Sequence, residues 1–322
     1  MKNMSQTNKD ADDSVEKLIA SQISQWDLAR SNYMDLENAM LRTVILDNGC
    51  RIKIQFNPSR MRSSAARVDK KSVSRRRCFL CSGNLPDQQR GLVFEDRYLI
   101  LVNPFPIFSR HLTIPLKEHT DQLIGGRFDD MLRLSRFLDS FIVFYNGPQC
   151  GASAPDHFHF QAGNKGFMPI EEEYHHFPRK LIAGKEGCTI EAMDGYYRNT
   201  LVLSGKNNEV LTTFFGKIYH ILRQSQESGD EPMMNILAGY EDGLWRVFIF
   251  PRRAHRPRQF FEKDDGQILI SPASVDFGGV WITPRREDYD KLDSETVMDI
   301  FAQVSYGGME WQNIKNILCN HK

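Results

Sequence analysis

The sequence lacks long hydrophobic runs, any surplus of one charge, and abundant cysteine. No segment approaches the uninterrupted apolar length of a membrane helix, and the N-terminus has no apolar signal-peptide region. The 41 basic and 41 acidic residues cancel, so no global field favours nucleic acid or an anionic membrane. Six cysteines in 322 residues, without an export signal, argue against a disulfide framework. We therefore expect a cytoplasmic protein that binds neither nucleic acid nor membranes.

What the sequence does have is one short run with strict alternation, from Asp156 to Gly163. In a strand, His157, His159 and Gln161 would share one face while two phenylalanines anchor the other. A single histidine would more often be a satisfied core group or face water from an edge strand. Two histidines and a glutamine in register instead favour a built site.

The segment before this run is rich in glycine, proline and small residues, from Asn146 to Pro155. Such a loop lets backbone N–H groups and a hydroxyl approach an anion closely. Gly151 and Ser153 are therefore candidate contacts for a phosphate that lies above a nucleophilic histidine.

The order Gly151-Ala152-Ser153, then His157-x-His159-x-Gln161, resembles the active-site motif of the histidine-triad-related nucleotidyltransferases. That group includes galactose-1-phosphate uridylyltransferase, diadenosine tetraphosphate phosphorylase and the GDP-hexose phosphorylases. The resemblance implies that His159 attacks an α-phosphorus to form a nucleotidyl-histidine, that Gln161 holds a phosphate oxygen, and that His157 completes the catalytic motif. One more residue separates Ser153 from His157 than in the uridylyltransferase pattern.

Weaker patches follow the same family order. An Asn at the position of Asn103 reaches the ribose or phosphate in the histidine-triad fold. Arg60 and Arg67 lie in a stretch that resembles the entry segment of the GDP-hexose phosphorylases, and an ordinary basic loop explains them equally well. Segments 271–275 and 281–289 resemble the C-terminal end of the same enzymes.

Cys78 and Cys81 have the spacing of a zinc knuckle, although a redox pair or a merely packed pair has the same pattern. The resemblance to uridylyltransferases and triad proteins implies two further ligands, His119 and His157. Zinc in such a closed Cys2His2 site would be structural and would not activate water.

Periodicity and turn signals predict an α+β fold with two histidine-triad-like halves, each an antiparallel sheet with packed helices, the second half degenerate. We expect a polar N-terminal segment and helix over 1–41, a catalytic half over 42–168 and a second half over 169–322. A helix is predicted around 15–41 with Ser14 as its cap, and another over 128–144. Strands are predicted within 42–56, 98–102, 111–115, 199–203, 235–240 and 245–250, a helix over 209–222, and helical spacing at Val297, Ile300 and Phe301.

The resulting hypothesis is a phosphorylase-type nucleotidyltransferase of the EC 2.7.7 class. Its substrate would be a nucleoside diphosphate sugar, with a GDP-hexose favoured, or a dinucleoside polyphosphate, and its acceptor inorganic phosphate or a sugar 1-phosphate. A histidine-triad hydrolase is the first alternative, although Gln161 stands where hydrolases carry a third histidine. A non-enzymatic, zinc-stabilised nucleotide-binding protein is the second. Related enzymes are often dimeric, so a homodimer is also an expectation.

Overall fold

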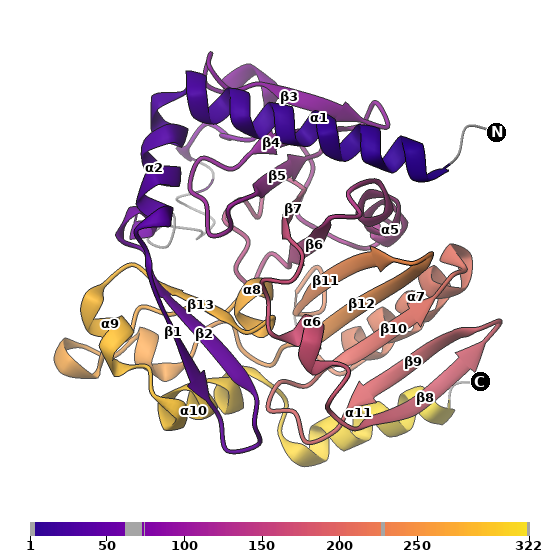
Figure 1. Cartoon of the computed structure of the whole chain (residues 1–322). Coiled ribbons are helices and arrows are strands. Elements are labelled where there is room, and N and C mark those ends of the chain that lie inside the picture. Colours follow the sequence, from indigo (N-terminus) through magenta and orange to yellow (C-terminus); the bar gives the residue numbers. More distant parts are fainter. Residues whose placement is uncertain (1–3, 62–72, 74, 227–228, 321–322) are drawn as a thin grey trace.

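The computed structural model describes residues 4–61, 73, 75–226 and 229–320 (Figure 1). Arg67 lies outside this part of the chain. The N-terminal helical region is two helices, α1 (Met4–Gln25) and α2 (Asp27–Glu37). The prediction of one helix capped by Ser14 is wrong, because Ser14 lies inside α1 and the break falls at Trp26. Trp26 has extended backbone angles (φ −120°, ψ 106°) and a buried side chain, so its packing interrupts the helix.

Ten strands form one antiparallel sheet in the order β3-β4-β5-β7-β6-β11-β12-β10-β9-β8. Each half of this sheet contains three strands, a helix and two more strands in chain order, and the two halves meet where β6 pairs with β11. The first half has β3 (Gly91–Phe94), β4 (Tyr98–Val102), β5 (His111–Pro115), α5 (Phe128–Phe137), β6 (Phe141–Asn146) and β7 (His159–Asn164). The second has β8 (Arg179–Lys185), β9 (Cys188–Met193), β10 (Leu201–Gly205), α7 (Asn208–Gln224), β11 (Met234–Glu241) and β12 (Leu244–Pro251).

This arrangement confirms the predicted pair of halves with a degenerate second member. The counterpart of β7 is β12, which also lies between the third and fourth strands of its half. On the face where β7 carries His159 and Gln161, β12 carries Phe248 and Phe250, which belong to a hydrophobic core. The histidine pair therefore has no counterpart there.

The predicted helix over 128–144 is too long. Helix α5 ends at Phe137, and β6 begins at Phe141. All six residues of β6 are buried. A fully buried central strand shows a continuous apolar run rather than alternation, and in the sequence such a run is easily joined to a preceding helix.

A second sheet, of three strands, pairs a hairpin from the first part of the chain with a strand from the last part. β1 (Met40–Ile45) and β2 (Arg51–Phe56) form the predicted hairpin around Asp47-Asn48-Gly49, and β2 also pairs in parallel with β13 (Val280–Thr283). The remaining helices are α6 (Ile170–Glu173), α8 (Ser274–Phe277), α9 (Arg286–Lys291), α10 (Ser294–Val304) and α11 (Gly308–Asn320). Short 3₁₀ turns lie at Pro58–Arg60, Ser82–Asn84, Arg258–Phe260 and Asp264–Gly266. Helix α10 confirms the helical spacing that was predicted from Val297 onward.

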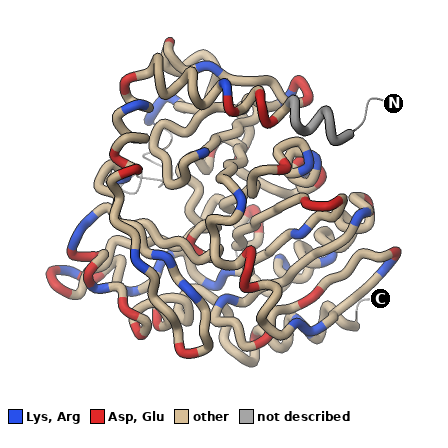
Figure 2. The backbone as a smooth tube through the Cα atoms, viewed as in Figure 1, with Lys and Arg blue, Asp and Glu red and all other residues tan. Residues whose placement is uncertain are grey.

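The large sheet is covered on both faces. One core packs α1, α5, α7 and α11 against it, and the other packs the small sheet with α8, α9 and α10 (Figure 1). Acidic and basic residues are interspersed over the fold (Figure 2). No helix among the described residues is long and apolar enough to cross a bilayer.

Candidate active site and metal centre

A cavity of about 500 Å³ opens beside the start of β7, and both halves of the chain line it. The sequence-predicted residues Gly151, Ser153, His159, Gln161, Asn103 and Arg60 all line this cavity. His157 is not among the lining residues. The walls are largely apolar, and include Trp26, Phe79, Leu80, Leu101, Phe105, Ile107, Phe144, Phe260, Leu269, Ile270, Val275 and Ile282.

His159 is held in one tautomer by a backbone carbonyl two residues earlier in the chain. Its Nδ1 lies 2.9 Å from the backbone oxygen of His157. A carbonyl oxygen only accepts hydrogen bonds, so Nδ1 carries the proton and donates it, and Nε2 keeps its lone pair. Burial lowers the pKa of His159 to about 4, because the charged ring would lose its hydration. The neutral imidazole is therefore the stable form near pH 7.

Gln122 fixes the backbone of His159 and was not predicted from the sequence. Its amide oxygen accepts the His159 N–H at 2.7 Å, and its amide nitrogen donates to the His159 carbonyl at 2.9 Å and to the Asn146 carbonyl at 3.1 Å. The backbone pairing of β6 with β7 ends at Phe144 and Gln161, two residues short of Asn146 and His159. The Gln122 side chain thus continues the sheet where the two strands separate. Nothing in the loop sequence around Gln122 indicates this role.

The loop before β7 packs against the second half of the chain. Gly151 has φ +95°, and a Cβ there would lie 2.6 Å from the Cβ of Ala273. The side-chain oxygen of Asn146 accepts hydrogen bonds from the Ser274 N–H at 2.8 Å and from the Asn235 amide at 2.9 Å. The loop position is therefore set by contacts with residues of the second half, 89 or more positions later.

Asn103 and Arg60 lie at the cavity with their side chains already engaged. The Asn103 amide donates to the Thr113 hydroxyl at 2.9 Å and its oxygen accepts from the Phe105 N–H at 2.9 Å. The Arg60 guanidinium donates to the Phe105 carbonyl, and burial lowers its pKa to about 10, so it stays charged at neutral pH.

The second half adds cavity residues that sequence reasoning missed. Arg256 donates from Nε to the Ser271 hydroxyl at 3.2 Å, with its guanidinium 3.9 Å from the ring centre of Phe260. Asp276 also lines the cavity, and burial raises its pKa to about 7. The segment is anchored by Arg252, whose side chain is fully buried. Arg252 donates to four backbone carbonyls and one amide oxygen, those of Pro272, Ala254, His255 and Val304 and the side chain of Asn235.

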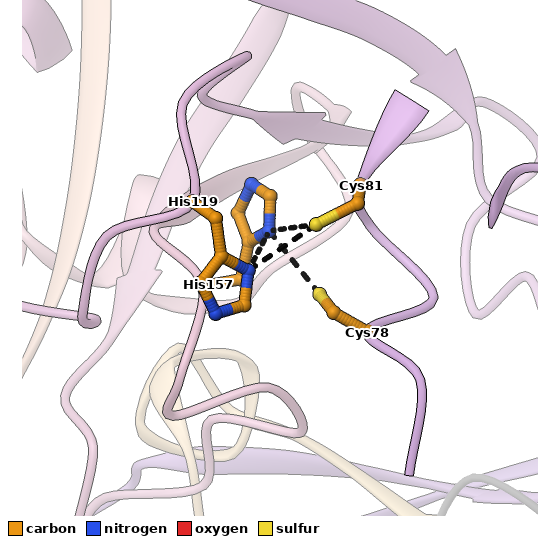
Figure 3. Close-up of side chains that lie close together, drawn as sticks. All are labelled: Cys78, Cys81, His119 and His157. Atoms are coloured by element: carbon orange, nitrogen blue, oxygen red, sulfur yellow. Dashed lines mark hydrogen bonds between the residues drawn. The ribbon is translucent and has the colours of Figure 1, made fainter. Parts of the chain in front are cut away.

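Cys78, Cys81, His119 and His157 come together beside the cavity, with their ligand atoms within 4.8 Å of one another (Figure 3). The His157 Nδ1 lies 3.2 Å from the Cys78 sulfur, and the His119 Nδ1 lies 3.2 Å from the Cys81 sulfur. The two Nδ1 atoms are 3.1 Å apart. Tetrahedral zinc would place sulfur and nitrogen ligands about 3.6 Å apart and two nitrogens about 3.3 Å apart. The four residues can therefore hold such an ion.

The orientation of His157 fits a metal ligand. Its Nε2 lies 2.7 Å from the Leu116 carbonyl, so Nε2 carries the proton and Nδ1 turns a lone pair toward the cysteines. Arg76 links the Cys78 segment to the loop by an ion pair with Asp156 at 2.9 Å. The cysteine turn is thus attached to the loop that carries Ser153.

Two family models match the chain. One, described as a domain of unknown function (DUF4922), covers residues 18–164, and the GDPGP1-like C-terminal domain covers residues 171–322. No curated protein sequence matches. Yeast Ap4A phosphorylase Apa2 is similar in structure. Its complex with AMP has a TM-score of 0.62 at 16% identity, over 91% of this chain and 96% of that one. Its complex with Ap4A has a TM-score of 0.58 at 15% identity, over 88% and 97%.

The GDPGP1-like match over residues 171–322 and the fold shared with the Ap4A phosphorylase over most of the chain are consistent with the histidine-triad-related nucleotidyltransferase superfamily. They accord with the resemblance drawn from the His157-x-His159-x-Gln161 motif. The low identity to the solved structures means that their likeness establishes the fold, and the chemistry has to be argued from this chain's own residues.

Gly151 provides a test of how tightly the loop before β7 is held against the second half. Gly151→Ala should lower the free energy of unfolding by about 2–3 kcal/mol, because it adds a clash with Ala273 to the cost of a positive φ. Gly49→Ala is the matched control: φ is +86° and no atom lies within 4 Å of its added Cβ, so about 1 kcal/mol is expected. Urea unfolding measures both, and equal losses would contradict the close approach.

Metal content tests the Cys2His2 group. The purified protein should contain about one zinc ion per chain, and Cys78→Ser and Cys81→Ser should each lose most of it. Cys319→Ser, which changes a cysteine outside the group, should keep the metal. Elemental analysis gives the content, and a chelator should lower the melting temperature of the wild type and of Cys319→Ser but not that of Cys78→Ser or Cys81→Ser. Full zinc in the Cys78→Ser variant would contradict the assignment.

Proposed function

We propose that this chain is a phosphorylase-type nucleotidyltransferase in which His159 is the nucleophile. The observation that carries the proposal is the hydrogen bond from His159 Nδ1 to the His157 carbonyl, which leaves Nε2 unprotonated on a ring that lines the cavity. In the first step Nε2 forms a bond to an α-phosphorus, and the bond from that phosphorus to its bridging oxygen breaks. The electron pair leaves with the oxygen, which departs as a sugar 1-phosphate anion from a nucleoside diphosphate sugar or as a nucleoside polyphosphate anion from a dinucleoside polyphosphate.

In the second step an oxygen of inorganic phosphate attacks the same phosphorus, the N–P bond breaks, and the electron pair returns to Nε2. The first leaving group is a stable phosphate-type anion and the second is the neutral imidazole of His159, so neither step needs a strong base. The protein's contribution would be positioning and charge stabilisation. Gln161, Ser153, Arg60 and Arg256 line the cavity around His159 and are the proposed contacts for phosphate oxygens.

The substrate class follows from the relatives and the cavity together. A nucleoside diphosphate sugar, with a GDP-hexose favoured, accords with the GDPGP1-like C-terminal model, and a dinucleoside polyphosphate accords with the likeness to an Ap4A phosphorylase solved with AMP and with Ap4A. The cavity volume of about 500 Å³ lies within the range of small-ligand sites. Asn103 lies on the wall built by β4 and β5, where we propose that the ribose binds.

Zinc held by Cys78, Cys81, His119 and His157 would supply a structural cross-link. His157 reaches the group with its side chain and holds His159 with its backbone oxygen. We assign His157 a role in orienting His159 and none in the bond-making steps, since its ring lies outside the cavity lining.

A hydrolase remains the second candidate function, because water could resolve the same intermediate. Gln161 disfavours it, since the third histidine of the triad hydrolases is absent from that position. If product formation without inorganic phosphate equals that with it, the hydrolase is the correct assignment.

Intact-protein mass spectrometry tests the nucleophile. Mixing the chain with a panel of GDP-, UDP- and ADP-sugars and diadenosine tetraphosphate, without phosphate, should add the mass of one nucleoside monophosphate, which added phosphate then removes. His159→Ala should abolish the adduct because it deletes Nε2. His176→Ala, a change to an exposed histidine that does not line the cavity, should leave it intact. An adduct that persists in His159→Ala would refute the mechanism.

The depressed pKa of His159 predicts an unusual pH profile. A histidine with an ordinary pKa of about 6.5 would lose about tenfold of its neutral form by pH 5.5. The pKa of about 4 keeps His159 neutral, so the single-turnover rate of adduct formation from a nucleoside diphosphate sugar should change less than twofold between about pH 5.5 and pH 8. Zinc content is measured at each pH as the control. A midpoint near 6.5 at full zinc content would contradict the burial argument.

A further inference from the structure

We propose that His111 is a positioning residue that turns the amide of Gln161 so that its NH₂ group, and not its oxygen, faces the cavity. The inference rests on the proposed function in one respect, that Gln161 binds a phosphate oxygen. It adds a residue that neither the motif nor the superfamily match points to, because His111 lies on β5, almost fifty positions before the motif.

The surroundings of His111 fix its tautomer. The ring is fully buried, stacked on Phe144 at 5.9 Å between ring centres and edge-on to Phe108 at 5.5 Å. Its Nδ1 lies 3.3 Å from the Ile107 backbone nitrogen, whose N–H can only donate. In a neutral imidazole with Nδ1 as the acceptor, the proton must be on Nε2.

The ring is neutral at every pH at which the protein would work. Burial is the larger cause and the nearby Arg60 guanidinium the next, and together they lower the pKa of His111 to about 3. His111 therefore acts as a fixed donor at Nε2 and never presents a second N–H at Nδ1.

That donor settles the orientation of Gln161. The His111 Nε2 lies 3.2 Å from the Gln161 side-chain oxygen. Reversing the amide would place its NH₂ against the Nε2–H of His111, two donors facing each other in a buried site. The oxygen is thus held by His111 and the NH₂ is the end left for a ligand. Two amide hydrogens suit the anionic oxygens of a phosphoryl group, whereas the lone pairs of a reversed amide would repel them.

Two substitutions separate donation from packing. His111→Phe keeps an aromatic ring against Phe144 and Phe108 but removes both nitrogens, and should slow the single-turnover formation of the nucleotidyl adduct about tenfold at saturating substrate. His111→Gln can still donate an N–H toward Gln161 and should recover most of that loss. Melting temperatures identify any variant that fails to fold. If His111→Phe fails, the comparison of His111→Gln with the wild type tests the proposal, and His111→Asn replaces His111→Phe in the double-mutant cycle below.

A double-mutant cycle tests whether His111 acts through Gln161. In a Gln161→Ala background, His111→Phe should change the rate by less than about twofold, because no amide remains to be oriented. Losses that multiply across the cycle would overturn the proposal and make His111 a packing residue.

A second readout keeps this outcome separate from a failure of the proposed function. Binding of GDP to the same four proteins is measured by calorimetry, with the same non-additive pattern expected in affinity. If the wild type forms no adduct with any substrate, the proposed function fails, and the binding cycle still decides the role of His111. Additive losses of GDP affinity would reject it.

Discussion

The hydrogen bond from His159 Nδ1 to the His157 carbonyl is the interaction on which the rest of the site depends. It is local, spanning two residues, yet it requires a backbone oxygen that is turned away from the sheet ladder. That oxygen is available because β7 begins only at His159, and the Gln122 amide supplies the hydrogen bonds that a strand partner would otherwise give there. The separation of β6 from β7 thus creates both the carbonyl that selects the tautomer and the space into which Nε2 is presented.

The same local geometry explains what could be predicted from the sequence. Alternation placed His159 and Gln161 on one face, and this holds because both lie within β7 and line the cavity. It also placed His157 with them, and there it does not hold, since the strand has not yet started and the His157 ring turns toward Cys78 and Cys81. Periodicity indicates a face only where the backbone is regular. The motif predicted the three residues, but the start of β7 at His159 determines that only His159 and Gln161 line the cavity.

Other parts of the site could not be predicted, because distant segments build them. Arg256 and Asp276 reach the cavity from beyond β12, held there by Arg252, whose basic neighbourhood reads in sequence as a solvated surface. The fully buried β6 shows no alternation that could have separated it from α5. His111 and Gln122 give no local signal, since their side chains bond to residues in another part of the chain, Gln161 for His111, and His159 and Asn146 for Gln122.

The two halves of the sheet explain why one cavity needs the whole chain. In the second half, Phe248 packs edge-on to Tyr174 and Phe250 lies 5.2 Å from Phe277, so aromatic rings fill the face that corresponds to the histidine pair. With that face closed, the segment after β12 continues instead to the first half, where Ala273 meets Gly151 and Ser274 donates to Asn146. The second half carries phenylalanines where the first carries histidines, and it forms part of the cavity wall of the first. Its segment after β12 both holds the loop before β7 and brings Arg256 and Asp276 to the cavity, so the cavity depends on both halves.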